Sequence, residues 1–228
     1  MFKDKTPEQL KQEYQFTLSK ISHEIRNPVT LINSYLQFIE QAHPEVDGYE
    51  YWEDLWDQMD FLKKLLDELS LYNNSGKLHL EPIHISPYLA RLVSGFRPAY
   101  RYLGIRLLYE DLTKDTDPVL SLDIVKIQQT LYNLIRNACE SIDGAGEVHI
   151  ILKREKGFLL IQIADDGCGI DPAHLATLFD PFVTHKKNGT GLGLAIVREI
   201  IHAHGGEVSV SSRPAKGSVF TLSFPMSG

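Results

Sequence analysis

Apolar residues recur at intervals of three or four along the first part of the chain, and this spacing constrains the fold more than any other feature. The pattern runs from about Thr6 to Ala42, breaks at the turn residues Pro44 and Gly48, and resumes in a second run. It predicts two helices, each with one apolar face. This apolar stripe consists of Tyr14, Leu18, Ile21, Ile25, Val29, Ile32, Leu36 and Ile39, then Trp52, Leu55, Met59, Leu62, Leu66 and Leu69. Because a hairpin cannot enclose its own stripe, we expect two copies to form a four-helix bundle.

A different pattern begins after Gly76, which lies in the sequence NNSGK and suits a helix end and a linker. Alternating apolar residues predict strands within 77–85, 105–112, 147–166 and 207–225, the third range holding two strands about a Lys-Gly turn. Helical spacing covers 86–104, 123–142 and 191–206. Such a mixture predicts a two-layer α/β sandwich. We therefore expect two domains, residues 1–76 and residues 77–228.

Charge and cysteine content exclude several classes of function. The net charge is −7 and the basic residues form no stripe, which argues against binding nucleic acid. Cys139 and Cys168 lie far apart without metal-ligand spacing, as in a reducing compartment. No apolar run reaches the roughly 18 residues of a membrane span, and the N-terminus is too polar for a signal peptide. We expect a cytoplasmic chain without membrane contact, which could be part of a longer, membrane-anchored protein.

The sequence SHEIRNPVT interrupts the first helix with a proline. At about 100° per residue, His23 and Asn27 fall on the face away from the apolar stripe, with Glu24 beside them. Pro28 has no N–H for the carbonyl group of Glu24, so we expect a kink that costs about 3 kcal/mol. A solvated helix face with an incidental histidine is the simpler alternative. A local cost in free energy that has no structural reason favours a functional role for the histidine.

Further segments carry polar or glycine-rich patterns. NLIRNACES places two asparagines four positions apart on one helix face, and their amide oxygens suit a hard cation such as Mg²⁺. IADDGCGID is a strand that ends in a carboxylate and glycines, which by itself is equally typical of a tight turn. THKKNGTGLGLAI brings glycines to a helix start, where backbone N–H groups can approach phosphates. The candidate residues are Asn133, Asn137, Asp165, Gly167, Gly169, Lys186, Gly189, Gly191, Leu192 and Gly193.

In chain order these segments resemble the boxes of the histidine kinases of two-component signalling. SHEIRNPVT is similar to the H-box, QTLYNLIRNACES to the N-box, DDGCGI to the G1 box, LFDPFVTHK to the F-box and GTGLGLAI to the G2 box. The resemblance extends from about residue 10 to residue 226, and within the family the hairpin is most similar to the kinases that control sporulation. It implies a dimeric hairpin bundle followed by a Bergerat-type ATP-binding sandwich.

The resemblance also implies roles for the candidate residues. His23 would accept the phosphoryl group from ATP, Glu24 would orient its ring, and Asn27 would position water for dephosphorylation of a partner. Asp165 would accept a hydrogen bond from the adenine amino group. Asn137 and Asn133 would hold Mg²⁺. A lid over the phosphates would consist of Lys186 and the segment from Gly189 to Gly193.

The implied function is ATP-dependent phosphorylation of a histidine and transfer of the phosphoryl group to a response-regulator aspartate. A phosphatase activity is compatible with this function. The implied partners are a second copy of the chain, a response regulator or phosphotransfer protein on the hairpin, and an inhibitor protein at the same bundle. Ser218 departs from the threonine of many relatives but keeps a hydroxyl group. Two alternatives stay open: a non-signalling ATPase of the same sandwich family, and an inactive dimeric scaffold.

Overall fold

The computed structural model describes residues 7–113, 118–186 and 189–226, with side chains from Thr17 onward. The chain divides into two compact units, which are residues 1–74 with 185–192, and residues 75–184 with 193–228. The predicted domain boundary at residue 76 falls between the last helix of the hairpin and the first strand that follows it. No helix in the described part of the chain is long and apolar enough to cross a lipid bilayer.

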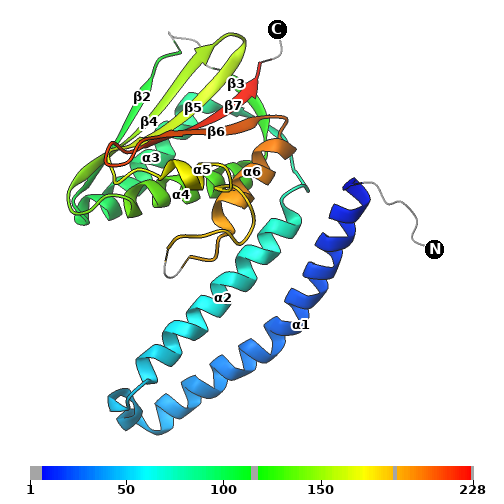
Figure 1. Ribbon diagram of the computed structural model, residues 1–228, viewed down its shortest axis with the longest axis vertical. Coiled ribbons are helices and arrows are strands. Elements are labelled where there is room, and N and C mark those ends of the chain that lie inside the picture. The colour runs from blue at the N-terminus through cyan, green and yellow to red at the C-terminus, as the bar shows by residue number, and fades with distance from the viewer. Residues whose placement is uncertain (1–6, 114–117, 187–188, 227–228) are drawn as a thin grey trace. The chain divides into compact units, whose positions relative to one another are not determined.

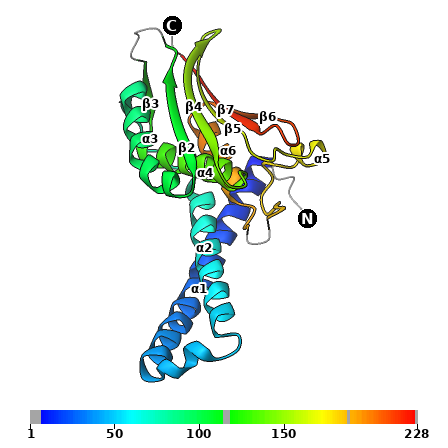
Figure 2. The same cartoon turned by 90° about the vertical axis from the view of Figure 1, so that its left-hand side faces the viewer.

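The first unit contains the predicted helical hairpin. Helices α1 (Pro7–Ala42) and α2 (Trp52–Asn74) lie side by side and are joined through the short 3₁₀ helix η1 (Pro44–Gly48), as Figures 1 and 2 show. The interface between the helices buries Val29 and Leu36 of α1 against Met59 and Leu66 of α2, with two tryptophans packed beside them. Alternate members of the predicted stripe thus hold the hairpin together.

Six further members of the stripe are exposed within a single chain. Ile21, Ile25, Ile32 and Ile39 of α1 are 42–48% exposed, and Leu55 and Leu62 of α2 are 39–41% exposed. Each helix therefore has apolar area left over after the hairpin has formed. The side chain of Tyr14 lies outside the described residues. Helix α1 continues through Pro28, and the kink expected there stays a prediction.

The second unit is an α/β sandwich, as predicted. Its larger sheet runs in the order β2–β4–β5–β7–β6, in which β2 is parallel to β4 and the other neighbours are antiparallel. The strands are β2 (Ile105–Asp111), β4 (Gly146–Glu155), β5 (Phe158–Asp165), β6 (Glu207–Ser212) and β7 (Ser218–Pro225). Helices α3 (Ile85–Tyr102), α4 (Ile124–Glu140) and α6 (Gly193–Ala203) lie against one face of this sheet (Figures 1 and 2).

Alternation along the strands builds the core between these layers. Val148, Ile150 and Leu152 of β4 point toward the helices and are at most 1% exposed, as are Leu131 and Leu134 of α4. Burial of apolar side chains contributes roughly 25 cal/mol for each Å² removed from water, so this layer is the main source of stability in the unit. It fixes α4 against the sheet, and α4 carries the candidate asparagines.

In the described part of the sandwich unit, two elements were not predicted. Strand β3 (Val119–Leu122) pairs with β1 (Glu81–His84) in a small antiparallel sheet, and its four residues are too few to show a period. Helix α5 (Pro172–Leu175) is a single turn that is capped by Asp171, whose carboxylate accepts a hydrogen bond from the N–H of Ala173 at 2.8 Å. Helix α6 begins at Gly193 rather than at the predicted Gly191, which has a φ of +71°.

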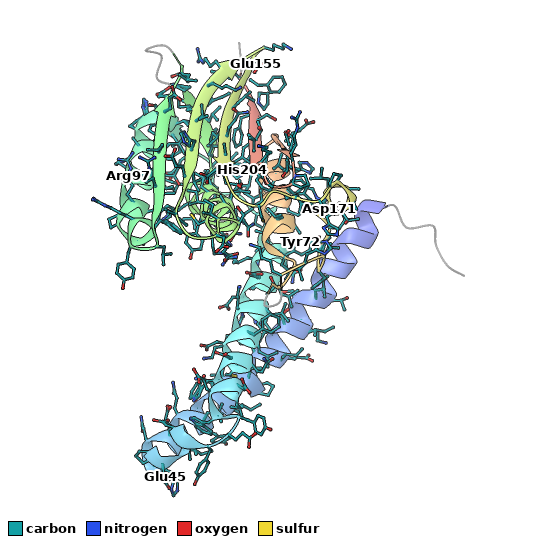
Figure 3. The ribbon with its side chains drawn as sticks, turned by 60° about the vertical axis from the view of Figure 1, so that its left-hand side comes forward. Glu45, Tyr72, Arg97, Glu155, Asp171 and His204 are labelled. Atoms are coloured by element: carbon teal, nitrogen blue, oxygen red, sulfur yellow. The ribbon has the colours of Figure 1, made fainter. Side chains whose placement is uncertain are left out.

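His204, labelled in Figure 3, follows the end of α6 and contacts the start of α4. Nε2 of His204 accepts a hydrogen bond from the N–H of Asp123 at 2.9 Å, and Nδ1 lies 2.7 Å from the carbonyl oxygen of Ile200. Asp123 itself caps α4 through the N–H of Lys126 and also accepts from the N–H of His79. The ring must therefore be neutral, with its proton on Nδ1.

This contact predicts a loss of stability in mild acid. Burial lowers the pKa of His204, and the charge of the nearby Lys126 lowers it further. The hydrogen bond to the Ile200 carbonyl group and the charge of Asp123 raise this pKa in part. A histidine with a lowered pKa in the folded state stabilises the fold above about pH 6.5 and loses that contribution as the pH falls toward its folded value. We expect His204→Gln to lower the free energy of unfolding by about 1 kcal/mol at pH 8 and by less at pH 5.5. Urea denaturation at both pH values measures the difference, with His202→Gln as the control. An equal loss at both pH values would contradict the neutral contact.

Candidate functional site

His23, Glu24 and Asn27 are exposed on α1, as their angular positions predict. Ser22 is 3% exposed beside them, and its hydroxyl group donates to the carbonyl oxygen of Leu18 at 2.7 Å. One turn of the helix thus has a side on which Ser22 is buried and a side that displays the histidine. An exposed imidazole next to a carboxylate has the chemistry of a nucleophile with an orienting group.

Arg26 connects this turn of α1 to α2. Its guanidinium group donates to the carbonyl oxygen of Leu66 at 3.2 Å and to the carboxylate of Asp67 at 3.0 Å. Because a guanidinium group has donors in a rigid plane, it can hold both oxygens at once. The contact fixes the turn that carries His23 against the neighbouring helix.

Asp165 lies at the end of β5, in the core of the second unit. It is 9% exposed, and its Oδ1 accepts hydrogen bonds from the N–H of Gly167 at 3.0 Å, the N–H of Ser218 at 3.2 Å and the hydroxyl group of Ser141 at 3.0 Å. Within the residues that the structure describes, no hydrogen bond reaches its other oxygen, Oδ2. The carboxylate is therefore held in place by one oxygen while the second can accept a hydrogen bond from a ligand.

The surroundings also set the charge of Asp165. Burial raises the pKa of its carboxyl group, and the charge of Asp166 raises it further, while the hydrogen bonds from Gly167, Ser141 and Ser218 lower it. The three donors thus offset part of the cost of burying the charged form. A buried, well-oriented carboxylate with a perturbed pKa is typical of a binding site.

Close packing explains the first glycine of the G1 segment. A Cβ atom on Gly167 would clash with the hydroxyl group of Ser141 and lie 2.6 Å from its carbonyl oxygen. Any side chain here would push α4 away from β5 and break the contact between Ser141 and Asp165. Gly169 has a φ of +71°, and a Cβ atom there would clash in the same way with the backbone of Arg213. The predicted glycines are thus required by the shape of the loop.

The asparagines lie on the helix face that leads to Asp165. Asn133 is 7% exposed and Asn137 is half-buried, and Ser141 follows at the same interval of four residues. Residues at this spacing share one face of a helix. The structure therefore brings the N-box and G1 segments together, through the serine at the end of α4.

The glycine-rich segment is divided between the two units. Gly193 is the first residue of α6, which belongs to the sandwich. Lys186, Gly189, Gly191 and Leu192 belong to the unit of the hairpin. Their role as nucleotide ligands stays a prediction.

The sequence alone did not identify Ser141 or Ser218 as partners of Asp165. Ser141 was within the quoted N-box segment, and its distance of four residues from Asn137 was the available signal. The contact with the backbone of Ser218 depends on the pairing of β5 with β7, in which Asp165 lies opposite Ser218. The hydroxyl group of Ser218 lies 2.9 Å from that of Ser212, so it belongs to the support of the site.

Comparisons with known proteins agree with this arrangement. Residues 122–228 match the family described as histidine kinase-, DNA gyrase B-, and HSP90-like ATPase. The signal transduction histidine-protein kinase AtoS of Escherichia coli is 30% identical over 92% of this chain and 34% of its own length. Sporulation kinase A of Bacillus subtilis is 33% identical over 90% of this chain and 33% of its own length. The chain thus spans about a third of the length of these curated relatives.

A solved structure shares the fold of most of the chain. The full-length kinase ShkA in complex with AMPPNP has a TM-score of 0.74 and 25% sequence identity, over 93% of this chain and 46% of that chain. The match to the ATPase family covers the part of the sandwich from residue 122 onward, which includes Asp165, and the kinases align with both the hairpin that carries His23 and the sandwich. Residues 122–228 belong to this ATPase family, and the chain is homologous over about nine tenths of its length to sensor histidine kinases.

Proposed function

We propose that this chain binds Mg-ATP in its sandwich unit, transfers the γ-phosphoryl group to His23, and passes it to an aspartate of a response regulator. The observation that supports this most strongly is the buried carboxylate of Asp165, which three donors hold through one oxygen. A carboxylate accepts hydrogen bonds and cannot donate them while it is ionised. It therefore suits the amino group of adenine.

The phosphates and Mg²⁺ would lie toward the asparagines of α4. Amide oxygens are hard ligands, as Mg²⁺ prefers, but a pair of them cannot complete six-fold coordination. In the described residues, no cluster of three or more His, Cys, Asp or Glu side chains could hold a metal ion. This donor set fits a cation that is shared with phosphates, with Asn137 and Asn133 as the protein ligands. Lys186 and the segment from Gly189 to Gly193 would contact the phosphates as a lid.

His23 would act as the nucleophile. When bound, ATP supplies the phosphoryl group and Mg²⁺ neutralises the charge of its phosphates. A ring nitrogen of His23 forms the bond to phosphorus as the bond between phosphorus and the bridging oxygen breaks, and ADP leaves with that electron pair. Glu24, the next residue on the exposed turn, would accept a hydrogen bond from the other ring N–H and so orient the ring.

The uncovered stripe supports a dimer. Ile21, Ile25, Ile32 and Ile39 remain 42–48% exposed on one side of α1, and water-exposed apolar area of that extent favours association. A four-helix bundle of two hairpins covers this face. We expect light scattering to give the mass of a dimer. A stable monomer that still phosphorylates itself would contradict this part of the proposal.

The partner of the hairpin would be a response regulator that docks on the face of His23 and Asn27. Asn27 lies one helical turn beyond His23 and is exposed. Its amide group can orient a water molecule toward a phosphoryl group on the partner but is not needed when His23 attacks ATP. An inhibitor protein at the same bundle would compete for this face.

Replacing Asn27 with alanine tests the second role. We expect Asn27→Ala to keep phosphorylation of His23 and transfer to the regulator within about threefold, while the kinase-stimulated decay of the phosphorylated regulator falls at least about tenfold. The measurement pairs the labelling rate of His23 with the decay of purified phospho-regulator in the presence of ADP. Gln37→Ala, on the same helix, is the control. If both rates fell equally, or if the decay did not change, Asn27 would not be a selective water-positioning group.

Two alternatives make different predictions. A non-signalling ATPase of the sandwich family would hydrolyse ATP without phosphate on His23. An inactive scaffold would dimerise without binding nucleotide, although the retained Asp165 and its three donors favour binding. Incubation with ATP labelled in the γ position separates the three. We expect label on the protein, whereas released phosphate alone would support the ATPase.

A further inference from the structure

The hydroxyl group of Ser141 lies between two acceptors at the end of α4. Its Oγ is 2.7 Å from the carbonyl oxygen of Ala138 and 3.0 Å from Oδ1 of Asp165. A serine hydroxyl has one proton, so it donates to one of these oxygens at a time. An ionised Asp165 attracts that proton, whereas an Asp165 protonated on Oδ2 attracts it less, so that the hydroxyl group donates to Ala138 instead.

The position of this hydroxyl group is fixed by the backbone. The N–H of Ser141 donates to the carbonyl oxygen of Asn137 at 3.1 Å, and the carbonyl oxygen of Ser141 accepts from the N–H of Cys168 at 2.9 Å. The other donors to Asp165, the N–H groups of Gly167 and Ser218, belong to the backbone and cannot turn away. Ser141 is thus the side-chain donor that responds to the charge of Asp165.

We propose that Ser141 is a positioning residue for nucleotide selection, which holds Asp165 as an ionised acceptor and thereby favours adenine over guanine. The inference rests on the proposed function, in which Asp165 meets the base. Adenine presents an amino donor where guanine presents a carbonyl oxygen. An ionised carboxylate attracts the first and repels the second, but a protonated carboxyl group can donate to guanine.

The neighbouring groups make this donor necessary. Asp166 follows Asp165 in the chain, and its charge raises the pKa of the Asp165 carboxyl group. Cys139 approaches from α4, and burial, together with the Asp165 carboxylate, raises the pKa of its thiol to about 12. Burial and the charge of Asp166 thus disfavour a charge on Asp165, whereas the thiol of Cys139 is uncharged at pH 6 and pH 8. Removal of the Ser141 hydroxyl group takes away one of three compensating hydrogen bonds. The protonated form of Asp165 then becomes more populated as the pH falls.

Ser141→Ala in the full chain tests this role by nucleotide binding, without any requirement for turnover. Calorimetric titration with Mg-ADP and with Mg-GDP at pH 8 and pH 6 gives four dissociation constants for each protein. We expect the preference of the variant for ADP over GDP to fall about tenfold relative to wild type at pH 6, and by about threefold or less at pH 8. Because the preference of the variant is compared with that of wild type at the same pH, protonation of the nucleotide affects both proteins equally and does not change the comparison. Ser223→Ala, whose hydroxyl group contacts the carbonyl oxygen of Glu207 at an exposed strand, should leave both ratios unchanged.

A matched pair of variants keeps the test decisive if alanine weakens the fold. Threonine and valine have nearly the same shape and differ in the hydroxyl group, so Ser141→Thr should keep the preference for ADP and Ser141→Val should lose it. Equal losses of ADP and GDP affinity in both variants, at both pH values, would show a merely structural role and overturn the inference. A wild-type chain that binds no ADP would instead contradict the proposed function.

Discussion

Asp165→Asn should reduce the affinity for ATP at least about 100-fold, which corresponds to about 3 kcal/mol, while the hairpin remains folded. The geometry explains why so similar a side chain fails. The donors from Gly167, Ser218 and Ser141 all end on one oxygen, so the oxygen of an asparagine must take that position. Its NH₂ group then faces the adenine amino group, and two donors meet where a hydrogen bond is needed.

Calorimetric titration with Mg-ATP measures this loss. Asp166→Asn is the matched control, because Oδ1 of Asp166 accepts a hydrogen bond from the N–H of Glu147 at 2.9 Å and an asparagine oxygen can replace it. We expect the control to bind ATP within about threefold of wild type. Unchanged ATP affinity in Asp165→Asn would show that the base binds elsewhere.

His23→Gln should abolish phosphorylation of the protein, to below about 1% of the wild-type label, without loss of folding or ATP binding. The side chain is exposed on α1, so its replacement leaves the buried side of the helix unchanged. Glutamine has no nitrogen lone pair that could attack phosphorus at neutral pH. The effect is therefore confined to the chemical step.

The matched control is His43→Gln, at the end of the same helix. His43 lies on the surface, with Nδ1 3.0 Å from the carboxylate of Glu45. It should take part in no step, and this variant should label like wild type. Label that persists on His23→Gln would place the acceptor on another residue.

The sequence predicted the elements whose pattern is long enough to show a period. Helices α1 and α2 follow from the three-four spacing, and the same angular reasoning placed His23 and Asn27 on the exposed face. The sandwich followed from strands and helices that alternate after Gly76. Strand β3, with four residues, and the single turn of α5 had no comparable signal.

The candidate site could be predicted in its parts but not in its connections. Asn133 and Asn137 share a helix face by their spacing, and Asp165 was placed at a strand end. Ser218, however, lies 53 positions from Asp165, and the contact depends on the register of β5 with β7. Ser141 reaches Asp165 only because Gly167 lets α4 approach the loop. Such contacts depend on tertiary packing, which local patterns do not encode.

Intact mass after incubation with Mg-ATP tests the central claim most directly. Phosphohistidine is labile in acid, whereas phosphate esters of serine, threonine and tyrosine are not. We predict a gain of one phosphoryl group per chain at neutral pH that disappears after brief treatment with acid and does not form in His23→Gln. No gain in mass, or a gain that survives acid, would contradict the assignment of His23 as the phosphoacceptor.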